Sequence, residues 1–261
     1  MLWVDKHRPT TLDKCDYHTE LCERLLELAS KTDIPHMMFY GPSGAGKKTR
    51  VMGFLRAVFG SGVEKLKLEH RSVKTPSRRT VEITTVASSY HIEMNPGDAG
   101  MYDRFIVQEV IKEIASSRNL DSKHAFKVVV LTEADQLTRD AQAALRRTME
   151  KHSATCRLIL LCNNPSKVID PVRSRCLGIR VPAPSVKDMM DVMTGVAGKE
   201  GLTLPRQMAV LVANKSGRNM RRALLMLEAS KVQNYPFKPD QQIAVMDWEQ
   251  CIAGIAVDVR H

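Results

Sequence analysis

The sequence predicts an α/β domain, in which a parallel sheet is covered by helices on both faces, followed by a small helical domain. Short apolar runs typical of buried strands alternate with amphipathic helical segments. A glycine-rich segment, Gly41–Lys47, separates one such strand from one such helix. Beyond Pro182-Ala183-Pro184 the apolar spacing is helical only, which indicates a linker and a second domain.

The elements of the first domain follow from spacing and from turn residues. Leu21, Leu25 and Leu28 lie roughly on one face, which predicts a helix over residues 18–30. The run Met37–Tyr40 predicts a buried strand that stops at Gly41. Further strands are predicted at 80–86, 90–94, 126–131 and 158–161, with a hairpin around 75–77, and further helices at 48–59, 103–117 and 138–151.

The second domain begins with a helix-start signal. Ser185 and Asp188 have the spacing of a capping box, with Asp in the acidic position. The helical pattern then continues to about residue 232 in three pieces, and the remaining residues show no clear period. We therefore expect an α/β domain at 1–183, a helical domain at 184–234 and a tail at 235–261.

Composition narrows the class of protein. The chain has 261 residues and a net charge of +10, which favours a polyanionic partner, nucleic acid first, although a merely basic soluble protein remains an alternative. None of the six cysteines forms a C-x-x-C pair or lies at zinc-finger spacing from histidines, so no metal site is expected. No signal peptide and no run of transmembrane length is recognisable, so a reducing compartment and no membrane partner are expected.

The glycine-rich segment nearly matches the phosphate-binding pattern G-x-x-x-x-G-K-[ST]. The glycines allow backbone N–H groups to face phosphate oxygens, and the lysine can reach the outer phosphates. The hydroxyl that should follow and hold Mg²⁺ is replaced by a lysine, so Mg²⁺ binding is in doubt. The nucleotide-binding candidates here are Gly41, Pro42, Ser43, Gly44, Ala45, Gly46, Lys47, Lys48 and Thr49.

A second departure follows the strand at 126–131. P-loop ATPases place an acidic pair there, and the first position is Thr132 in this chain, so the carboxylate that supports the metal is missing. Glu133 keeps the position that polarises the attacking water; alternatively, Glu133 and Asp135 are solvated loop carboxylates. Phosphoryl transfer depends on the metal for charge stabilisation. The two losses together predict a site that binds ATP or ADP and hydrolyses ATP poorly.

Several motifs occur in an order that resembles a known family. They are Trp3–Pro9, the phosphate loop, Thr132–Asp135, Ala144–Glu150, Cys162-Asn163, Ser174-Arg175-Cys176 and Gly217–Leu224. Together they resemble the small subunits of eukaryotic replication factor C, the AAA+ loader of sliding clamps. The resemblance implies an AAA+ P-loop domain with a helical lid, and a collar domain that is missing or truncated here.

The resemblance also implies roles for single residues. Arg175 matches an arginine finger that reaches the ATP of a neighbouring subunit, and Asn163 matches a sensor near the γ-phosphate. Arg221 matches a second sensor from the lid. Val4 and Arg8 lie in a segment that resembles the one wrapping the adenine. A finger that acts in trans is worth ~10³–10⁵ in rate in related systems.

The implied partners are the other replication factor C subunits in a hetero-pentamer, the sliding clamp (proliferating cell nuclear antigen) and primer–template DNA, in the nucleus. Arg104 and Arg139 are candidates for DNA phosphate contacts, with exposed, solvated charges as the alternative. Two other functions stay open: a self-sufficient AAA+ ATPase that remodels DNA, and a DNA-binding scaffold that needs no nucleotide. ATPase of the isolated chain and nucleotide binding separate them.

Overall fold

The computed structural model describes residues 1–31, 33–74, 80–116, 126–237, 241, 243 and 247–259. The chain divides into two compact units, Pro9–Pro182 and Met1–Arg8 together with Ala183–His261. Residues 1–8, which were expected in the α/β domain, therefore group with the helical unit. The predicted hairpin turn at 75–77 lies outside the described residues.

A seven-stranded sheet, counted over the described residues, forms the α/β unit in the order β2-β3-β4-β5-β6-β1-β7. Its strands are β1 (Met37–Tyr40), β2 (Lys67–Lys74), β3 (Thr80–Ala87), β4 (His91–Met94), β5 (Lys127–Leu131), β6 (Cys156–Cys162) and β7 (Leu177–Arg180). The strands from β4 to β7 in this order are parallel, as predicted. β2, β3 and β4 pair antiparallel, so the sheet is mixed and carries an extension that the parallel prediction did not include.

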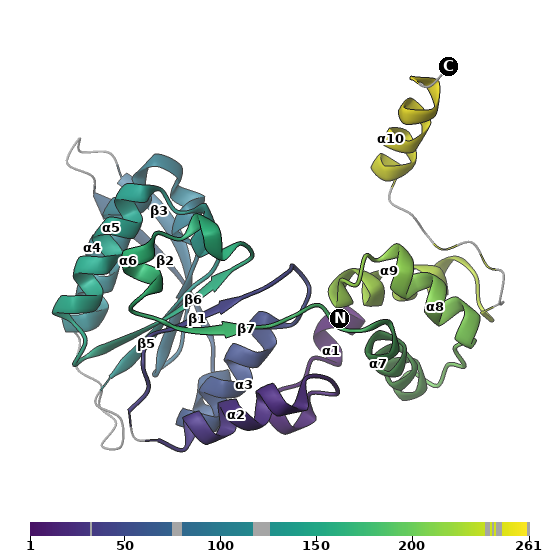
Figure 1. The fold of residues 1–261 in the computed structure, drawn as a ribbon, viewed down its shortest axis with the longest axis horizontal. Helices are drawn as coiled ribbons and strands as arrows, with labels where there is room; N and C mark the ends of the chain where they lie inside the picture. Colours follow the sequence, from purple (N-terminus) through teal and green to yellow (C-terminus); the bar gives the residue numbers. More distant parts are fainter. Residues whose placement is uncertain are drawn as a thin grey trace. The chain divides into compact units, whose positions relative to one another are not determined.

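Helices cover both faces of this sheet, and the period-two alternation of the strands assigns each side chain to a face. Met38 and Leu160 pack in the cluster that includes residues of α4 and α5, whereas Met37, Phe39 and Ile159 pack in the cluster that includes α2 and α3. Figure 1 shows the two helix layers on opposite sides of the strands. The helices of this unit are α2 (Thr19–Ala29), α3 (Lys47–Phe59), α4 (Asp103–Ser116), α5 (Arg139–Lys151) and α6 (Asp170–Arg173).

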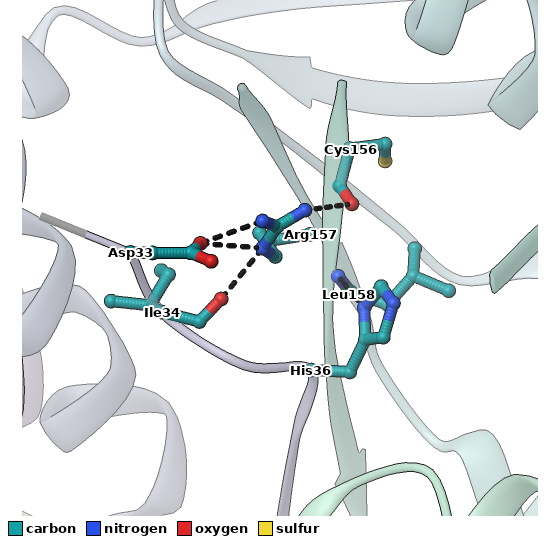
Figure 2. A network of polar contacts seen from close by, with 6 residues as sticks. All are labelled: Asp33, Ile34, His36, Cys156, Arg157 and Leu158. Carbon is teal, nitrogen blue, oxygen red and sulfur yellow. Dashed lines mark hydrogen bonds and ion pairs between the residues drawn. The ribbon is translucent and has the colours of Figure 1, made fainter. Parts of the chain in front are cut away.

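A polar network ties the amino ends of β1 and β6 together (Figure 2). Arg157 donates from Nε to the carbonyl oxygen of Ile34 at 2.6 Å and forms an ion pair from Nη2 to Asp33 Oδ1 at 2.6 Å. His36 Nδ1 accepts the backbone N–H of Leu158 at 3.0 Å, so this ring nitrogen carries no proton. Burial, followed by the charge of Arg157, lowers the pKa of His36 and favours that neutral form.

The helical unit contains α1 (Trp3–Lys6), α7 (Val186–Lys199), α8 (Arg206–Lys215), α9 (Met220–Gln233) and α10 (Asp247–Asp258). The predicted capping box is confirmed: Ser185 Oγ accepts the N–H of Asp188 at 3.0 Å, and Asp188 Oδ2 accepts the N–H of Ser185 at 2.9 Å. Trp3 is 5% exposed, and its backbone N–H donates to Glu228 Oε2 at 3.0 Å. The burial of Trp3 explains why the first residues belong to this unit.

The tail contains a helix that the sequence analysis did not predict. α10 carries Ile252 and Ile255 three positions apart, and these two side chains are 57% and 56% exposed. Few polar residues separate the apolar ones in this segment, so the sequence shows no clear helical period there.

Candidate nucleotide site

The parallel strands bring three predicted segments to one edge of the sheet, because the carboxyl ends of parallel neighbours lie side by side. β1 leads into the phosphate loop, β5 leads into Thr132–Asp135, and β6 leads into Asn163. Lys47 Nζ donates to Asn163 Oδ1 at 2.8 Å across 116 positions of sequence. The predicted loop and the predicted sensor are therefore in contact.

The conformation of the phosphate loop requires glycine at its first position. Gly41 has φ of 148°, and a Cβ there would lie 1.9 Å from the carbonyl oxygen of Val181. At the other end Gly46 is the N-cap residue of α3 and has no side chain that could cap it, and no other side chain of the described residues does so. The first N–H groups of a helix have no intrahelical partner, and together with the helix dipole they attract anions. The loop therefore has the features of a phosphate site.

The Lys47 side chain folds back onto the phosphate loop. Its Nζ donates to the carbonyl oxygens of Gly41 at 2.7 Å and Pro42 at 2.9 Å, in addition to Asn163. These acceptors are neutral, so a phosphate oxygen would compete with them through its charge. The ammonium group is thus held beside the uncapped start of α3 by partners that an anion can replace.

Lys48, which stands where a hydroxyl would hold a metal, forms an ion pair with Glu93 of β4. Its Nζ lies 2.5 Å from Glu93 Oε1, and the two side chains are 41% and 13% exposed. An ammonium group cannot coordinate a cation, and here it forms an ion pair with the Glu93 carboxylate. The position therefore does not fit Mg²⁺ in the way that a serine or threonine would.

The segment after β5 does not supply the missing metal ligand. Thr132 Oγ1 donates to the backbone oxygen of Met94 at 3.3 Å. Glu133 is exposed and has φ of 52°, an uncommon conformation for a residue other than glycine. Asp135 is 7% exposed and accepts the backbone N–H groups of Asn163 and Asn164, each at 3.2 Å. Asp135 is therefore a structural bridge between β5 and β6, and the solvated alternative is wrong for it.

Arg175 lies just after α6 and has its own partners in this unit. Its Nη2 is 2.7 Å from Glu150 Oε1, and its Nη1 donates to the carbonyl oxygen of Pro171 at 2.8 Å. The side chain is 35% exposed. Arg146 also donates to Glu150, at 3.2 Å, and these two arginines lower the pKa of the Glu150 carboxyl, Arg146 more strongly. The guanidinium is thus oriented by a carboxylate at the surface.

The two candidate DNA contacts lie at neighbouring helix starts. Arg104 is in the first turn of α4 and Arg139 is the first residue of α5, and both are exposed. Asp103 is 1% exposed and joins the two helices, because it accepts from the N–H of Thr138 at 2.7 Å and from its hydroxyl at 2.9 Å. Two helix N-termini therefore lie side by side, which is a favourable arrangement for phosphates.

Val4, Arg8 and Arg221 belong to the helical unit, and their part in nucleotide binding stays a prediction. Val4 is half-buried on α1, Arg8 forms an ion pair with Asp5 at 2.8 Å, and Arg221 is exposed in the first turn of α9. His7 Nε2 lies 2.5 Å from Glu200 Oε1 within the same unit.

Three residues of the site were missed from the sequence: Glu93, Arg50 and Tyr17. Glu93 lies 45 positions from its partner Lys48, and only the placement of β4 beside β5 brings them together. Arg50 is 1% exposed and contacts the carbonyl side of the phosphate loop together with Tyr17. No pattern in the sequence marks Arg50 or Tyr17 as part of the site.

Over the part of the chain that is described, no group of three His, Cys, Asp or Glu side chains is placed to hold a metal. In the same residues, no helix has the length and apolar character needed to cross a lipid bilayer. The six cysteines are free thiols.

Comparison with known proteins agrees with this geometry. Residues 17–185 match the model of the DNA polymerase III delta subunit, and residues 191–232 match that of the RCF1/5-like AAA+ ATPase lid domain. The Thermotoga maritima RuvB Holliday junction branch migration motor has the same fold, with a TM-score of 0.61 at 15% identity over 89% of this chain and 70% of that chain.

Close relatives identify the family. Replication factor C subunit 3 of Homo sapiens is 57% identical over 250 residues, which cover 95% of this chain and 70% of the human protein. The probable replication factor C subunit 3 of Dictyostelium discoideum is 51% identical over 261 residues, 99% of this chain and 75% of that protein. Replication factor C subunit 5 of Oryza sativa is 51% identical over 264 residues, again 99% and 75%. The chain therefore belongs to the replication factor C subunit 3/5 family of AAA+ clamp-loader proteins.

Proposed function

We propose that this protein is a clamp-loader subunit that binds ADP or ATP without a metal ion, hydrolyses ATP poorly, and supplies Arg175 to the ATP site of a neighbouring subunit. The Lys48–Glu93 ion pair is the main observation in support of nucleotide binding without a metal ion. It puts a protein cation where the metal ligand would be, and it engages the carboxylate of Glu93.

Nucleotide binding is supported by the loop itself. The uncapped start of α3 and the replaceable contacts of Lys47 offer N–H donors and one ammonium group to phosphate oxygens. Poor turnover is supported by Thr132, whose hydroxyl donates to Met94 and brings no carboxylate charge. Glu133 alone remains as a group that could polarise water.

The role of Arg175 is supported by its partly exposed, carboxylate-oriented guanidinium. In a complex with other replication factor C subunits, Arg175 would exchange Glu150 for the phosphate of the adjacent subunit. We further propose that the complex acts on the sliding clamp and on primer–template DNA in the nucleus, with Arg104 and Arg139 contacting DNA phosphates.

Equilibrium titration of the purified chain tests metal-free binding. ADP should bind with the same affinity in excess Mg²⁺ and in EDTA, whereas Lys47→Ala should bind at least tenfold more weakly because it loses a charge-assisted contact. A matched variant, Lys48→Thr, restores the hydroxyl and frees Glu93, so its affinity should depend on Mg²⁺. Wild-type binding that requires Mg²⁺ would contradict the proposal.

Steady-state kinetics test the remaining parts. The isolated chain should show no ATPase above the level of its Glu133→Gln variant. In a reconstituted complex, Arg175→Ala should lower ATPase and clamp loading by more than tenfold, since a trans arginine is worth ~10³–10⁵ in rate. Arg173→Ala, two positions away and paired with Asp170, is the control and should leave the rate unchanged.

A further inference from the structure

Arg50 is a buried cation behind the phosphate loop. It lies in α3, three positions after Lys47, and it is 1% exposed. Its Nη1 donates to the carbonyl oxygens of Ala45 at 3.2 Å and Gly46 at 3.4 Å. Its Nη2 donates to the carbonyl oxygen of Tyr17 at 2.8 Å. One guanidinium group therefore joins the loop to the segment before α2.

Tyr17 reaches the same point from that segment. Its hydroxyl donates to the carbonyl oxygen of Ala45 at 3.1 Å, and the Arg50 guanidinium lies 4.6 Å from the centre of its ring. A Cβ on Gly46 would be 2.7 Å from both the Tyr17 hydroxyl oxygen and Arg50 Nη1. The two side chains thus meet directly against the backbone of Gly46.

This arrangement is costly in free energy. A charged group is unfavourable to bury unless it is well paired. Within the described ranges no carboxylate forms an ion pair with Arg50, whose nitrogens Nη1 and Nη2 contact backbone carbonyls. Its charge also acts on the Cys22 thiol, whose pKa is lowered to about 6 by a hydrogen bond with Cys15 and then by Arg50. The Nε of Arg50 is buried without a hydrogen-bond partner among the same residues. A methionine would fill such a space without the charge, so packing alone does not account for an arginine here.

The geometry of the peptide group gives these contacts a consequence for the ligand. In a trans peptide the C=O of one residue and the N–H of the next point in opposite directions. Holding the oxygens of Ala45 and Gly46 behind the loop therefore turns the N–H groups of Gly46 and Lys47 toward its other side. Those amides are the ones that a phosphate loop offers to phosphate oxygens.

We propose that Arg50 and Tyr17 are positioning residues that fix the peptide planes on either side of Gly46 and so pre-organise the loop for the diphosphate of a nucleotide. The inference rests on the proposed nucleotide binding. Pre-organisation removes the cost of ordering the loop when the ligand arrives. Both residues contact carbonyl oxygens of the loop: Arg50 those of Ala45 and Gly46, and Tyr17 that of Ala45.

The test compares ADP and AMP binding to the full chain by calorimetry. Tyr17→Phe removes one hydroxyl and keeps the ring under Arg50, so ADP affinity should fall about fivefold, the equivalent of one hydrogen bond. Arg50→Met should weaken ADP by more than tenfold. AMP lacks the phosphate that the loop and Lys47 hold, so its affinity should change by less than twofold in Tyr17→Phe.

Arg56→Met is the matched control. Arg56 lies on the same helix, is half-exposed and pairs with Glu64, so this variant should keep both affinities within twofold of wild type. An unchanged ratio of ADP to AMP affinity in Tyr17→Phe would overturn the inference while leaving nucleotide binding intact. If Arg50→Met does not fold, Tyr17→Phe carries the test by itself. A wild-type chain that binds no ADP would overturn both the inference and the proposed function.

Discussion

Acid should destabilise the α/β unit through one buried histidine, His91. It is 1% exposed at the start of β4, and its Nδ1 lies 2.7 Å from the hydroxyl oxygen of Ser88. Burial lowers the pKa of His91 from 6.5 to about 4; the charge of Glu93 opposes this shift and the charge of Lys48 adds to it. The folded protein therefore keeps this ring neutral in a range where the unfolded chain protonates it.

The size and sign of the effect follow from linkage. Because the folded pKa lies below the unfolded one, the unfolded state binds more protons, and the unfolding free energy falls as the pH falls from 6.5 toward 4. A pKa of 6.5 unfolded and about 4 folded gives a loss of about 2 kcal/mol between pH 7 and pH 5, and about 3 kcal/mol once the pH reaches 4.

Urea unfolding at pH 7 and pH 5 measures this loss, followed by circular dichroism. Tryptophan fluorescence is less suitable, because Trp3 and Trp248 both lie outside the α/β unit. His91→Gln removes the titration, so the difference in unfolding free energy between the two pH values should be smaller by about 2 kcal/mol than in wild type. Carboxylates and His36 titrate in both proteins and cancel in this comparison.

His70→Gln provides the control. His70 is exposed on β2, so its ring meets water in the folded and the unfolded chain alike. This variant should keep the wild-type pH dependence. If wild type and His91→Gln lose the same free energy between pH 7 and pH 5, within about 0.5 kcal/mol, the assignment of a buried neutral His91 is refuted.

Three further predictions concern stability. Gly41→Ala should lower the unfolding free energy by more than about 2 kcal/mol, because its Cβ would lie 1.9 Å from the oxygen of Val181; thermal unfolding measures it. Gly195→Ala should raise the unfolding free energy by about 1 kcal/mol, since a Cβ in this helical position meets nothing within 4 Å. Thermal unfolding should therefore show a higher melting temperature for this variant. Asp135→Asn should cost about 1–3 kcal/mol and speed hydrogen exchange at Asn163 or Asn164, because the new amide nitrogen would face one of these two N–H groups.

Local patterns in the sequence predicted the parts of the fold that local forces determine. The run Met37–Tyr40, the glycines after it and the helix beyond are consecutive, so each constrains the next. The Ser185 cap joins groups three positions apart, and its bonds are confirmed. The contact of Lys47 with Asn163 needed one further step, the rule that parallel strands align their carboxyl ends.

The sequence did not predict features that depend on which distant segments meet. The antiparallel pairing of β2 with β3 agrees with the hairpin expected around 75–77, but no period in the sequence indicated a strand at 67–74 or placed this hairpin at the edge of the sheet. The grouping of residues 1–8 with the helical unit depends on the burial of Trp3 there. The contacts of Arg50 with Tyr17 span 33 positions, and a helix offers no pattern that marks one arginine as buried.

The three cations near the phosphate loop differ in how firmly the protein holds them, and this difference accounts for the separation of binding from turnover in the proposed function. Lys47 contacts neutral acceptors that a phosphate can replace. Lys48 is neutralised by Glu93, and breaking a partly buried ion pair is costly. Arg50 holds carbonyl oxygens from behind. In the proposed function, binding would use the replaceable contacts of Lys47 and the loop that Arg50 holds. Phosphoryl transfer would also need a metal ion, for which Lys48 paired with Glu93 is not a ligand.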